Sequence, residues 1–508
     1  MLKKLKVDKI LLLILLGGFI LRVVGVTHGF PFIFHPDEPA LVRSAIGIRF
    51  GPNPAHFDWP HLHFYLNFVL FMSYIKFRGL LQILGLQNFL SSYFPLMWRD
   101  PLVFYFLARL FNVVLGTLTA IPVYLAGKRL FNKQIGLIAA AVLMVMPFQV
   151  QSAPFALIDI PTAFWGMWAF YFAVKIFQEK DLRNYLLAGF FIGLSASTKY
   201  NGGLLAIMIP AAHFLRTWKS KNEKLLDWSG FKAHVISGIF AFLGFVLGTP
   251  YSILDFDTFT RTDGPKGALW QFANVGKVEF SEHISQFIQA LTFGFAKDFG
   301  YVFLFLYTLA VLYAIFIRRT KKIWLILIPS LFLFFYISGF VKVRTHYFTS
   351  TYPFVALVCG YVIVHLTETI KSKWKYLVLI SFFALPFWVS LQNVALLVRK
   401  DTRVIAYEWM LEHVKEGDRI IYNTSNLLPV LEKFSKNEVD KDLTGADFSY
   451  GKGYVVLGLQ YREVSGFFSS VNEKELESEK LEKVLEISQK GSRGPNIFIY
   501  AFEQNQTN

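Results

Sequence analysis

Two adjacent carboxylates, Asp37 and Glu38, follow the first long apolar run of the chain. They lie in the stretch FPFIFHPDEPALVRSAIG, residues 30–47, behind a His-Pro pair and ahead of a further proline. A carboxylate close to a membrane surface can act as a general base that removes a proton from an acceptor hydroxyl or amine. The pair could equally form the solvated first turn of a helix that begins after Pro36, where acids are favoured.

Cationic side chains from distant parts of the chain could complete a site for group transfer. Arginine and lysine can hold a phosphate and stabilise its negative charge as it leaves. Lys199 falls within or at the edge of an apolar segment, and because an intramembrane lysine is costly, it is a functional candidate. The residues that we expect at one membrane face are Asp37, Glu38, Arg43, His61, His63, Arg109, Asp159, Lys199, Arg344 and His346.

Several of these residues also have a purely structural interpretation. Lys199 could cap a short helix, and the RTHY stretch at residues 344–347 could anchor a helix end at the membrane interface. His61 and His63 are separated by one residue, which is weak evidence for a metal site. The DFD triplet at residues 255–257 looks like the DxD of soluble nucleotide-sugar enzymes, but a three-residue motif often arises by chance.

The composition indicates that these residues belong to a polytopic membrane protein. Of the 508 residues, 54% are hydrophobic and only 17% are charged, which is too few for a soluble chain of this length. Many apolar runs reach the roughly 17 residues that a membrane helix needs. The net charge of +16 comes mostly from short Lys and Arg clusters between the apolar runs. Such clusters orient the chain in a membrane, so we expect no nucleic-acid partner.

The charge pattern predicts which side of the membrane each loop occupies. The basic N-terminus, MLKKLKVDK, is expected in the cytoplasm, and about residues 10–26 are expected to form an uncleaved signal anchor. The acidic pair is therefore expected outside the cytoplasm. Everything after about Lys400 is expected outside as well. The basic clusters that mark returns to the cytoplasmic side lie at residues 127–133, 178–184, 216–224, 318–322 and 367–375.

One part of the chain has an ambiguous number of crossings. Between the acidic pair and Lys128 the chain must cross the membrane an odd number of times, yet it has two apolar runs, at residues 62–86 and 102–126. We expect the first run to form interfacial or re-entrant helices and the second to be a full inward span. Arg109 then falls near the outer face. The whole chain is predicted to have about 11–13 membrane helices.

The last 110 or so residues change character and predict a second domain. We expect a transmembrane domain over residues 1–397 and a small extracytoplasmic α/β domain over residues 398–508. In the second domain, residues 406–423 read as an amphipathic helix followed by a strand, and two short buried strands follow, GYVVLGLQY and NIFIYAF. The charged stretch at residues 472–490 reads as a helix. The lone cysteine, Cys359, excludes an intramolecular disulfide.

Five features in this order resemble the membrane glycosyltransferases of the GT-C class. After the acidic pair come LARLFNVVLGTLTAIPVYLAGKRLF, LIDIPTAFW, STKYNGGLLA and RTHYFTSTYPFVAL. The set is similar to bacterial relatives of dolichyl-phosphate-mannose protein mannosyltransferases and of lipid A aminoarabinose transferases. The resemblance covers roughly residues 1 to 395. It rests on the ordered set and the matching topology, because no single motif is specific.

The resemblance implies an inverting transfer of a sugar from a polyprenyl-phosphate donor to an extracytoplasmic acceptor, which could be a protein, a lipid or a glycan. It assigns Asp37 as the catalytic base, with Glu38 placing either the acceptor or Asp37. No cofactor is expected to be required, although a divalent metal stays open, and no metal ligand is assigned. The donor phosphate site implied by the resemblance consists of Arg109, Lys199, Arg344 and His346.

Four further residues are candidates for substrate binding: Asp159, Tyr200, His61 and His63. The two histidines lie where the chain departs from the family. Many relatives have a His-Pro-Pro-Leu-type or Lys-Pro-Pro-type stretch before the second apolar run, whereas this chain has WPHLHFYL with a single proline, Pro60. This departure puts the roles of both histidines in doubt.

Two other classes of protein fit a polytopic chain with charges in its membrane segments. A transporter or lipid flippase would also carry such charges. The charges of this chain are expected at one face instead of the midplane, and no internal repeat of the kind common in transporters is present. A non-catalytic assembly subunit of the cell envelope would have no need for Asp37, Arg109 and Lys199 together. The sequence therefore favours the glycosyltransferase and leaves the sugar open.

Overall fold

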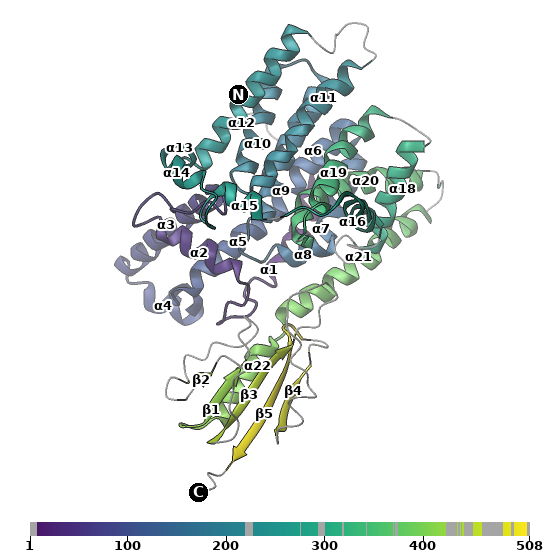
Figure 1. Ribbon diagram of the computed structural model, residues 1–508. Coiled ribbons are helices and arrows are strands. Elements are labelled where there is room, and N and C mark those ends of the chain that lie inside the picture. Colours follow the sequence, from purple (N-terminus) through teal and green to yellow (C-terminus); the bar gives the residue numbers. More distant parts are fainter. Residues whose placement is uncertain are drawn as a thin grey trace. The chain divides into compact units, whose positions relative to one another are not determined.

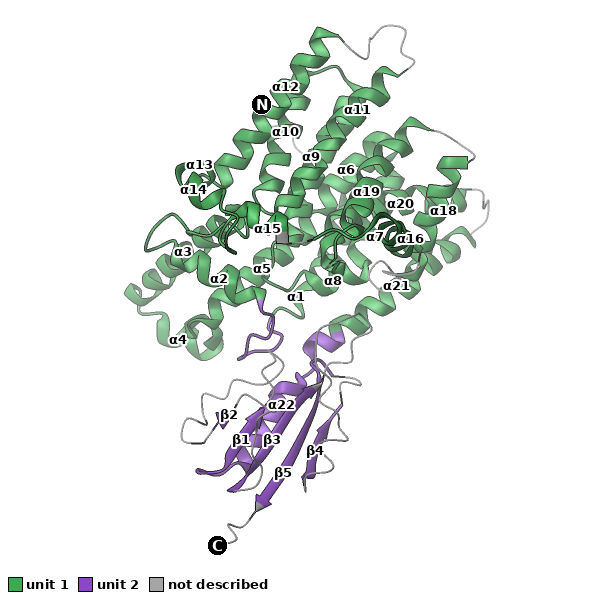
Figure 2. Ribbon diagram, in the orientation of Figure 1, with its two compact units in different colours: residues 1–26, 37–394 green, residues 27–36, 395–508 purple. Residues whose placement is uncertain are grey.

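The computed structural model describes residues 8–218, 227–274, 276–292, 300–316, 320–341, 343–368, 370, 374–422, 434, 437, 439–440, 451–459, 481–488 and 492–504. The chain forms two compact units, which Figure 2 colours separately. The first contains Met1–Val26 and Asp37–Val394, and the second contains Thr27–Pro36 and Ala395–Asn508. The domain boundary expected after residue 397 stays a prediction, and the second unit also takes in the short segment that leads to Asp37.

The first unit is built from helices, six of which are long and apolar enough to cross a bilayer among the described residues (Figure 1). They are α5 with α6 (Leu102–Leu118 and Ala120–Leu130), α9 (Asp159–Gln178), α12 (Trp228–Gly248), α19 (Lys321–Ser338), η3 with α20 (Thr345–Thr351 and Tyr352–Glu368) and α21 (Trp374–Val398). Shorter apolar helices are α7 (Lys133–Val145), α10 (Leu182–Ala196) and α18 (Tyr301–Phe316). The predicted α-helical polytopic fold is thus confirmed.

The remaining helices join these spans or lie beside them. They are α1 (Lys9–Val23), α2 (Asp37–Gly47), α3 (Leu62–Ile83), α4 (Gln87–Tyr93), η1 (Pro95–Trp98), α8 (Pro147–Ser152), η2 (Tyr200–Ile207), α11 (Met208–Thr217), α13 (Tyr251–Leu254), α14 (Phe256–Phe259), α15 (Ala268–Asn274) and α16 (Phe280–Thr292).

The first ambiguous apolar run folds as the bent pair α3 and α4, whose axes differ by 120°. Helix α3 ends because Gly85 adopts a left-handed conformation with φ +70°. The Leu86 N–H then donates to Leu81 O at 3.0 Å, which closes the helix end in the manner of a Schellman motif. This geometry fits the predicted interfacial or re-entrant pair. The second run is the continuous 29-residue helix Leu102–Leu130.

Helices α10 and α12 approach each other closely through glycines. A Cβ at Gly193 would lie 2.1 Å from Ala241 O, and one at Gly189 would lie 2.1 Å from Ser237 O. The two glycines are four residues apart on one face of α10, the spacing that lets membrane helices pack with their backbones in near contact. Since α10 leads directly into Lys199, this packing sets where that lysine lies.

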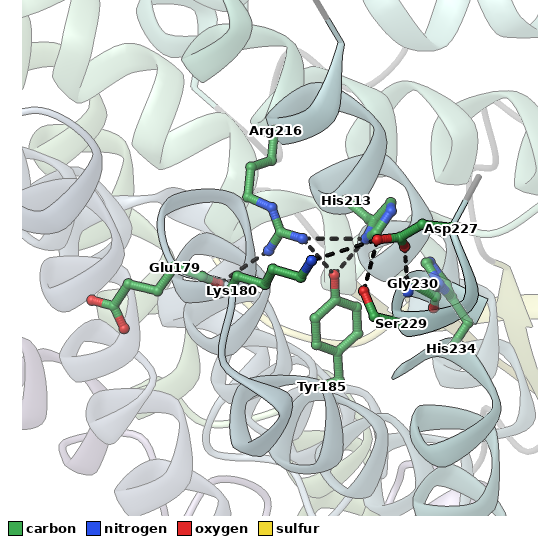
Figure 3. Close-up of polar contacts among 9 residues, drawn as sticks. All are labelled: Glu179, Lys180, Tyr185, His213, Arg216, Asp227, Ser229, Gly230 and His234. Atoms are coloured by element: carbon green, nitrogen blue, oxygen red, sulfur yellow. Dashed lines mark hydrogen bonds and ion pairs between the residues drawn. The ribbon is translucent and has the colours of Figure 1, made fainter. Parts of the chain in front are cut away.

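The opposite ends of α9–α12 are tied together by a polar cluster (Figure 3). Tyr185 Oη lies 2.5 Å from His213 Nδ1, and Arg216 Nη1 donates to Ile176 O at 2.7 Å and to Glu179 O at 3.0 Å. Arginine here satisfies the last carbonyls of α9, which have no partners inside the helix. This end of the helices contains Lys180 and Arg216 together with the acids Glu179 and Asp227.

The second unit consists of α22 (Thr402–His413) and a sheet with the strand order β2-β1-β3-β5-β4. The strands are β1 (Arg419–Tyr422), β2 (Val439–Asp440), β3 (Gly451–Leu459), β4 (Glu482–Ile487) and β5 (Asn496–Gln504). Strand β1 runs parallel to β2 and β3, and β5 runs antiparallel to β3 and β4. Ala406 and Met410 of α22 share one core with Ile420 and Ile499 of the sheet. The predicted helix and the three predicted strands are present.

The helix predicted over residues 472–490 is wrong where the structure describes the stretch. Residues 482–487 form the edge strand β4, paired with β5, while 472–480, 489 and 490 lie outside the described residues. Charged side chains are typical of edge strands, where they discourage further pairing. Pairing with β5 overrides a helix propensity that is only a weak preference.

We predict that Gly193→Ala destabilises the protein, whereas Gly238→Ala does not. The added methyl group at position 193 meets the carbonyl oxygen of Ala241, but at position 238 of α12 it meets no atom within 4 Å. Overpacking of this kind costs about 1–3 kcal/mol. Thermal unfolding in detergent measures the difference between two chemically identical substitutions. Equal melting temperatures for the two variants would contradict the close packing of α10 on α12.

Candidate active site

A cavity of about 460 Å³ lies in the helical unit. This volume is within the range typical of small-molecule sites. Its walls combine acids, bases and aromatic rings from widely separated segments. They are Asp37, Asp58, Trp59, Pro60, Leu157, Ile158, Asp159, Lys199, Tyr200, Asn201, Gly203, Leu204, Gln271, Phe272, Tyr336, Phe340, Arg344, His346 and Tyr347.

The cavity separates the residues proposed from the sequence into two groups. Those on its wall are Asp37, Asp159, Lys199, Tyr200, Arg344 and His346. Those absent from its wall are Glu38, Arg43, His61, His63 and Arg109. The structure therefore brings together the proposed base and three of the four residues proposed for the donor phosphate, Lys199, Arg344 and His346.

Asp37 is the first residue of α2, directly after Pro36. A carboxylate in the first turn of a helix is stabilised in its ionised form by the partial positive charge of the helix N-terminus. The proline before it cannot donate a hydrogen bond and so suits a chain that is about to enter a helix. Local sequence thus explains why a carboxylate at the start of a helix occurs at this point of the cavity wall.

Glu38 and Arg109 form a buried ion pair. Arg109 Nε donates to Glu38 Oε1 and Arg109 Nη2 to Glu38 Oε2, each at 2.7 Å, and both side chains are almost wholly buried. The Ala156 N–H also donates to Glu38 Oε1 at 2.9 Å, and Arg109 Nη1 donates to Val26 O at 3.1 Å. Because both charged groups are engaged with each other, Arg109 is positioned to hold α2 against α5. The expected direct contact of Arg109 with a donor phosphate has no support in this geometry.

Asn112 lies about one helical turn after Arg109 and holds the segment around Ala156, the residue whose N–H donates to Glu38. Its Nδ2 donates to Phe155 O at 2.7 Å and to Leu157 O at 2.6 Å. This segment leads to Asp159, the first residue of α9. Helix α5 therefore fixes the chain on both the Asp37 side and the Asp159 side of the cavity.

Asp159 and Lys199 form a second ion pair, this one on the cavity wall. Lys199 Nζ lies 2.6 Å from Asp159 Oδ1 and 4.8 Å from the centroid of the Tyr347 ring. The Asp159 carboxylate balances the positive charge of Lys199. The face of the Tyr347 ring adds a weak attraction for the Lys199 ammonium. Arg344 and His346, at the start of η3, reach the same cavity. The wall thus offers a cationic side that can meet a phosphate.

His61 and His63 are buried and stack on phenylalanine rings. His61 Nε2 donates to His56 O at 2.8 Å, and the ring stacks on Phe57 with centroids 4.6 Å apart. Burial lowers the pKa of His61 to about 4, so its ring is neutral near pH 7. His63 is fully buried and stacks on Phe111. Neither histidine lies on the cavity wall, and both instead help to pack α3 and the loop before it.

No group of three or more His, Cys, Asp and Glu side chains in the described part of the chain could hold a metal ion. The DFD triplet contributes instead to loop structure, because Asp255 Oδ2 accepts a hydrogen bond from Asn53 Nδ2 at 2.7 Å. That hydrogen bond, together with one from Thr258, lowers the pKa of Asp255. The expectation that no cofactor is required stays a prediction.

Among the wall residues that the sequence did not single out, Asp58 and Trp59 stand out for their chemistry. Asp58 Oδ1 lies 2.5 Å from His56 Nδ1, and His56 Nε2 lies 3.0 Å from Ser44 Oγ on α2. The signal was available in the sequence, because Asp58 directly precedes the WPHLHFYL stretch where the chain departs from the family pattern, and Trp59 is the first residue of that stretch.

We predict that Glu38→Ala destabilises the fold far more than Asp37→Asn. Removing Glu38 leaves the Arg109 guanidinium buried without its counter-charge, which typically costs about 3–5 kcal/mol. Asp37→Asn keeps the shape of a side chain that lies on a cavity wall. Unfolding temperatures of the two detergent-solubilised variants test the contrast. A Glu38→Ala protein as stable as the wild type would show that the buried pair has no structural importance.

The chain matches one family model and shares its fold with solved structures. Residues 105–247 match the model for dolichyl-phosphate-mannose-protein mannosyltransferase. No curated protein sequence matches the chain. ArnT from Cupriavidus metallidurans in the apo state is 12% identical, with a TM-score of 0.53 over 96% of this chain and 97% of ArnT.

Two further structures are similar at lower scores. ArnT bound to undecaprenyl phosphate is 12% identical, with a TM-score of 0.50 over 97% of both chains. The Archaeoglobus fulgidus oligosaccharyltransferase tethered with an acceptor peptide is 14% identical, with a TM-score of 0.49 over 92% of this chain and 67% of that chain. The chain is therefore similar to the mannosyltransferase family model over residues 105–247 and shares the fold of ArnT, and its long apolar helices indicate a multi-pass membrane protein.

Proposed function

We propose that the protein transfers a sugar from a polyprenyl-phosphate donor to an acceptor at the outer face of the membrane, with inversion at the anomeric carbon. The observation that carries this proposal is the cavity in which Asp37 meets Lys199, Arg344 and His346. ArnT, whose fold this chain shares, has been solved with undecaprenyl phosphate bound. The matched family is named for a dolichyl-phosphate sugar.

In this reaction the acceptor oxygen or nitrogen forms a bond to the anomeric carbon while the bond from that carbon to the phosphate oxygen breaks. Asp37 takes the proton that the acceptor loses, and the polyprenyl phosphate leaves with its bridging oxygen and the extra negative charge. A general base contributes typically about 10²–10⁴-fold to such a step. Positioning of the acceptor next to the donor supplies much of the rest.

The departing phosphate needs positive charge close to its oxygens. Arg344 offers a planar fork for phosphate oxygens, and Lys199 offers a point charge that Asp159 holds in place. We assign these two cations and His346 to the donor phosphate. Arg109 is reassigned as the partner of Glu38, which fixes the backbone next to Asp37. Glu38 therefore acts through position and not through contact with the acceptor.

We predict that Asp37→Asn lowers the transfer rate by a factor of about 10² or more, because the amide keeps the shape of the side chain but cannot take the proton. The measurement follows label from a radiolabelled polyprenyl-phosphate sugar into acceptor by the detergent-solubilised protein. Binding of the donor should persist in the variant. Near-normal turnover by a well-folded Asp37→Asn protein would remove Asp37 from this role, and label that never leaves the lipid in the wild type would favour a flippase.

We predict that the N-terminus is cytoplasmic and that the cavity and the C-terminal unit are extracytoplasmic. Lys180 and Arg216 lie near the C-terminal ends of α9 and α11 (Figure 3), whereas Lys199 follows the C-terminal end of α10. Lys and Arg at that end are expected of a cytoplasmic side by the positive-inside rule, which does not depend on nearby acids. A reporter fused after Asn508 tests the orientation. A fusion that is active only when its reporter is in the cytoplasm would reverse it.

A further inference from the structure

The loop that presents Asp58 to the cavity is pinned by hydrogen bonds on both sides. At its start, the Ala55 N–H donates to Asn53 Oδ1 at 2.9 Å, and Ala55 adopts a left-handed conformation with φ +59°. Asn53 Nδ2 in turn donates to Asp255 Oδ2. A non-glycine residue in this conformation costs free energy that the surrounding contacts must offset. The loop is therefore held in one shape.

Phe57, in the middle of the loop, anchors it to the helical unit. Its side chain is fully buried, its N–H donates to Lys266 O at 2.5 Å, and its carbonyl accepts a hydrogen bond from Tyr200 Oη at 2.7 Å. Tyr200 directly follows Lys199 in the chain. The loop is thus fastened beside the lysine that we assign to the donor phosphate.

Asp58 follows Phe57 and is held in one orientation by His56. As an ionised carboxylate it can only accept hydrogen bonds, so His56 Nδ1–H donates to its Oδ1. His56 is held on its other side by Ser44 of α2, the helix that begins with Asp37. The Asp58 side chain keeps 39% of its surface exposed, and among the described residues only His56 forms a hydrogen bond with it. A preorganised carboxylate with accepting capacity left over is suited to bind substrate hydroxyls.

Trp59 lies beside Asp58 on the same wall. A carboxylate next to an indole offers hydrogen-bond acceptors for hydroxyl groups and an apolar face for the C–H groups of a sugar ring. We propose, on the basis of the proposed function, that Asp58 and Trp59 form the subsite for the donor's sugar and that this sugar is a hydroxyl-rich ring without negative charge.

The position of the loop indicates that Asp58 and Trp59 bind the sugar of the donor and not the acceptor. The sugar of a polyprenyl-phosphate donor is bonded directly to the phosphate, so it must lie within a few ångströms of the cations that hold that phosphate. Phe57 is hydrogen-bonded to Tyr200, the neighbour of Lys199, and so Asp58 is close to that place.

The charges near Asp58 disfavour a sugar that carries a carboxylate. Asp37, Asp58 and Asp159 all line the cavity, and the Lys and Arg side chains on the same wall are Lys199 and Arg344, which we assign to the donor phosphate. A sugar carboxylate beside Asp58 would meet a like charge, which disfavours it.

The experiment compares the binding of lipids with and without a sugar. The probes are undecaprenyl phosphate itself and undecaprenyl phosphate bearing mannose, glucose, N-acetylglucosamine or glucuronic acid, each measured by native mass spectrometry on the full-length protein in detergent. We expect at least one uncharged sugar, and not glucuronic acid, to increase wild-type affinity over the bare lipid phosphate. Asp58→Asn should reduce affinity for that sugar lipid about tenfold or more, because it loses charge-assisted hydrogen bonds. Its affinity for undecaprenyl phosphate should be unchanged.

Two variants give matched comparisons. Asp257→Asn makes the same chemical change on α14, at an exposed residue away from the cavity wall, and should bind every lipid as the wild type does. Arg344→Gln should weaken binding of undecaprenyl phosphate with and without sugar alike.

The outcomes separate this proposal from the one on which it rests. A wild-type protein that does not bind undecaprenyl phosphate contradicts the proposed function. Intact binding of the bare lipid with no gain from any uncharged sugar overturns only the subsite, and so does a preference for glucuronic acid. Asp58→Asn could reduce the affinity for undecaprenyl phosphate equally with and without a sugar, or could change only the KM of the acceptor. Either result would likewise show that Asp58 does not bind the donor's sugar.

Discussion

The buried pair between Arg109 and Glu38 is the interaction on which the geometry of the site depends. A charge buried alone would cost several kcal/mol, and two buried charges are tolerated only when geometry and additional hydrogen bonds compensate for lost hydration. Here the guanidinium and the carboxylate meet through two parallel hydrogen bonds, and the backbone of Ala156 and Val26 satisfies further positions. The pair and its hydrogen bonds thereby tie together α2, α5, the turn after α1 and the segment before α9.

That arrangement explains why two adjacent acids have different surroundings. Successive residues of a helix point about 100° apart, so Asp37 and Glu38 cannot share one environment. Glu38 turns inward to Arg109, and Asp37 lies on the cavity wall. The pair that drew attention as a possible double carboxylate is therefore one structural acid and one acid available for chemistry. In the same way, Asp159 is neutralised by Lys199 and Asp58 is oriented by His56.

The membrane setting constrains how these groups are supported. Between helices in a bilayer, close van der Waals packing and hydrogen bonds replace much of the hydrophobic driving force available in water. The glycine contacts of α10 on α12 supply the close packing. The polar cluster around Tyr185, His213 and Arg216 supplies the hydrogen bonds. The packed helices carry Asp159 and Lys199 at one end and the polar cluster at the other. Rigid spans thus position side chains that a loop alone would leave free.

Much of the fold could be predicted from the sequence because the signals are local. Apolar run length and the placement of Lys and Arg depend on the solvent that each segment meets, and they correctly indicated a polytopic membrane protein with a small C-terminal sheet. The bend between α3 and α4 also has a local cause in Gly85. Residues 482–487 show the limit, since a charged stretch that suits a helix is a strand once β5 lies beside it.

By itself, the sequence indicated a polytopic membrane protein, an acidic pair after the first apolar run and a set of candidate cations. Only the tertiary structure decided which of these residues meet. Arg109 and Glu38 are 71 residues apart, and Lys199 and Asp159 are 40 apart, so no local pattern records their pairing. The same contacts removed Arg109 from the cavity and left Asp58 on its wall. Hydropathy and charge act along the chain, whereas pairing and access are set by the through-space packing of distant segments.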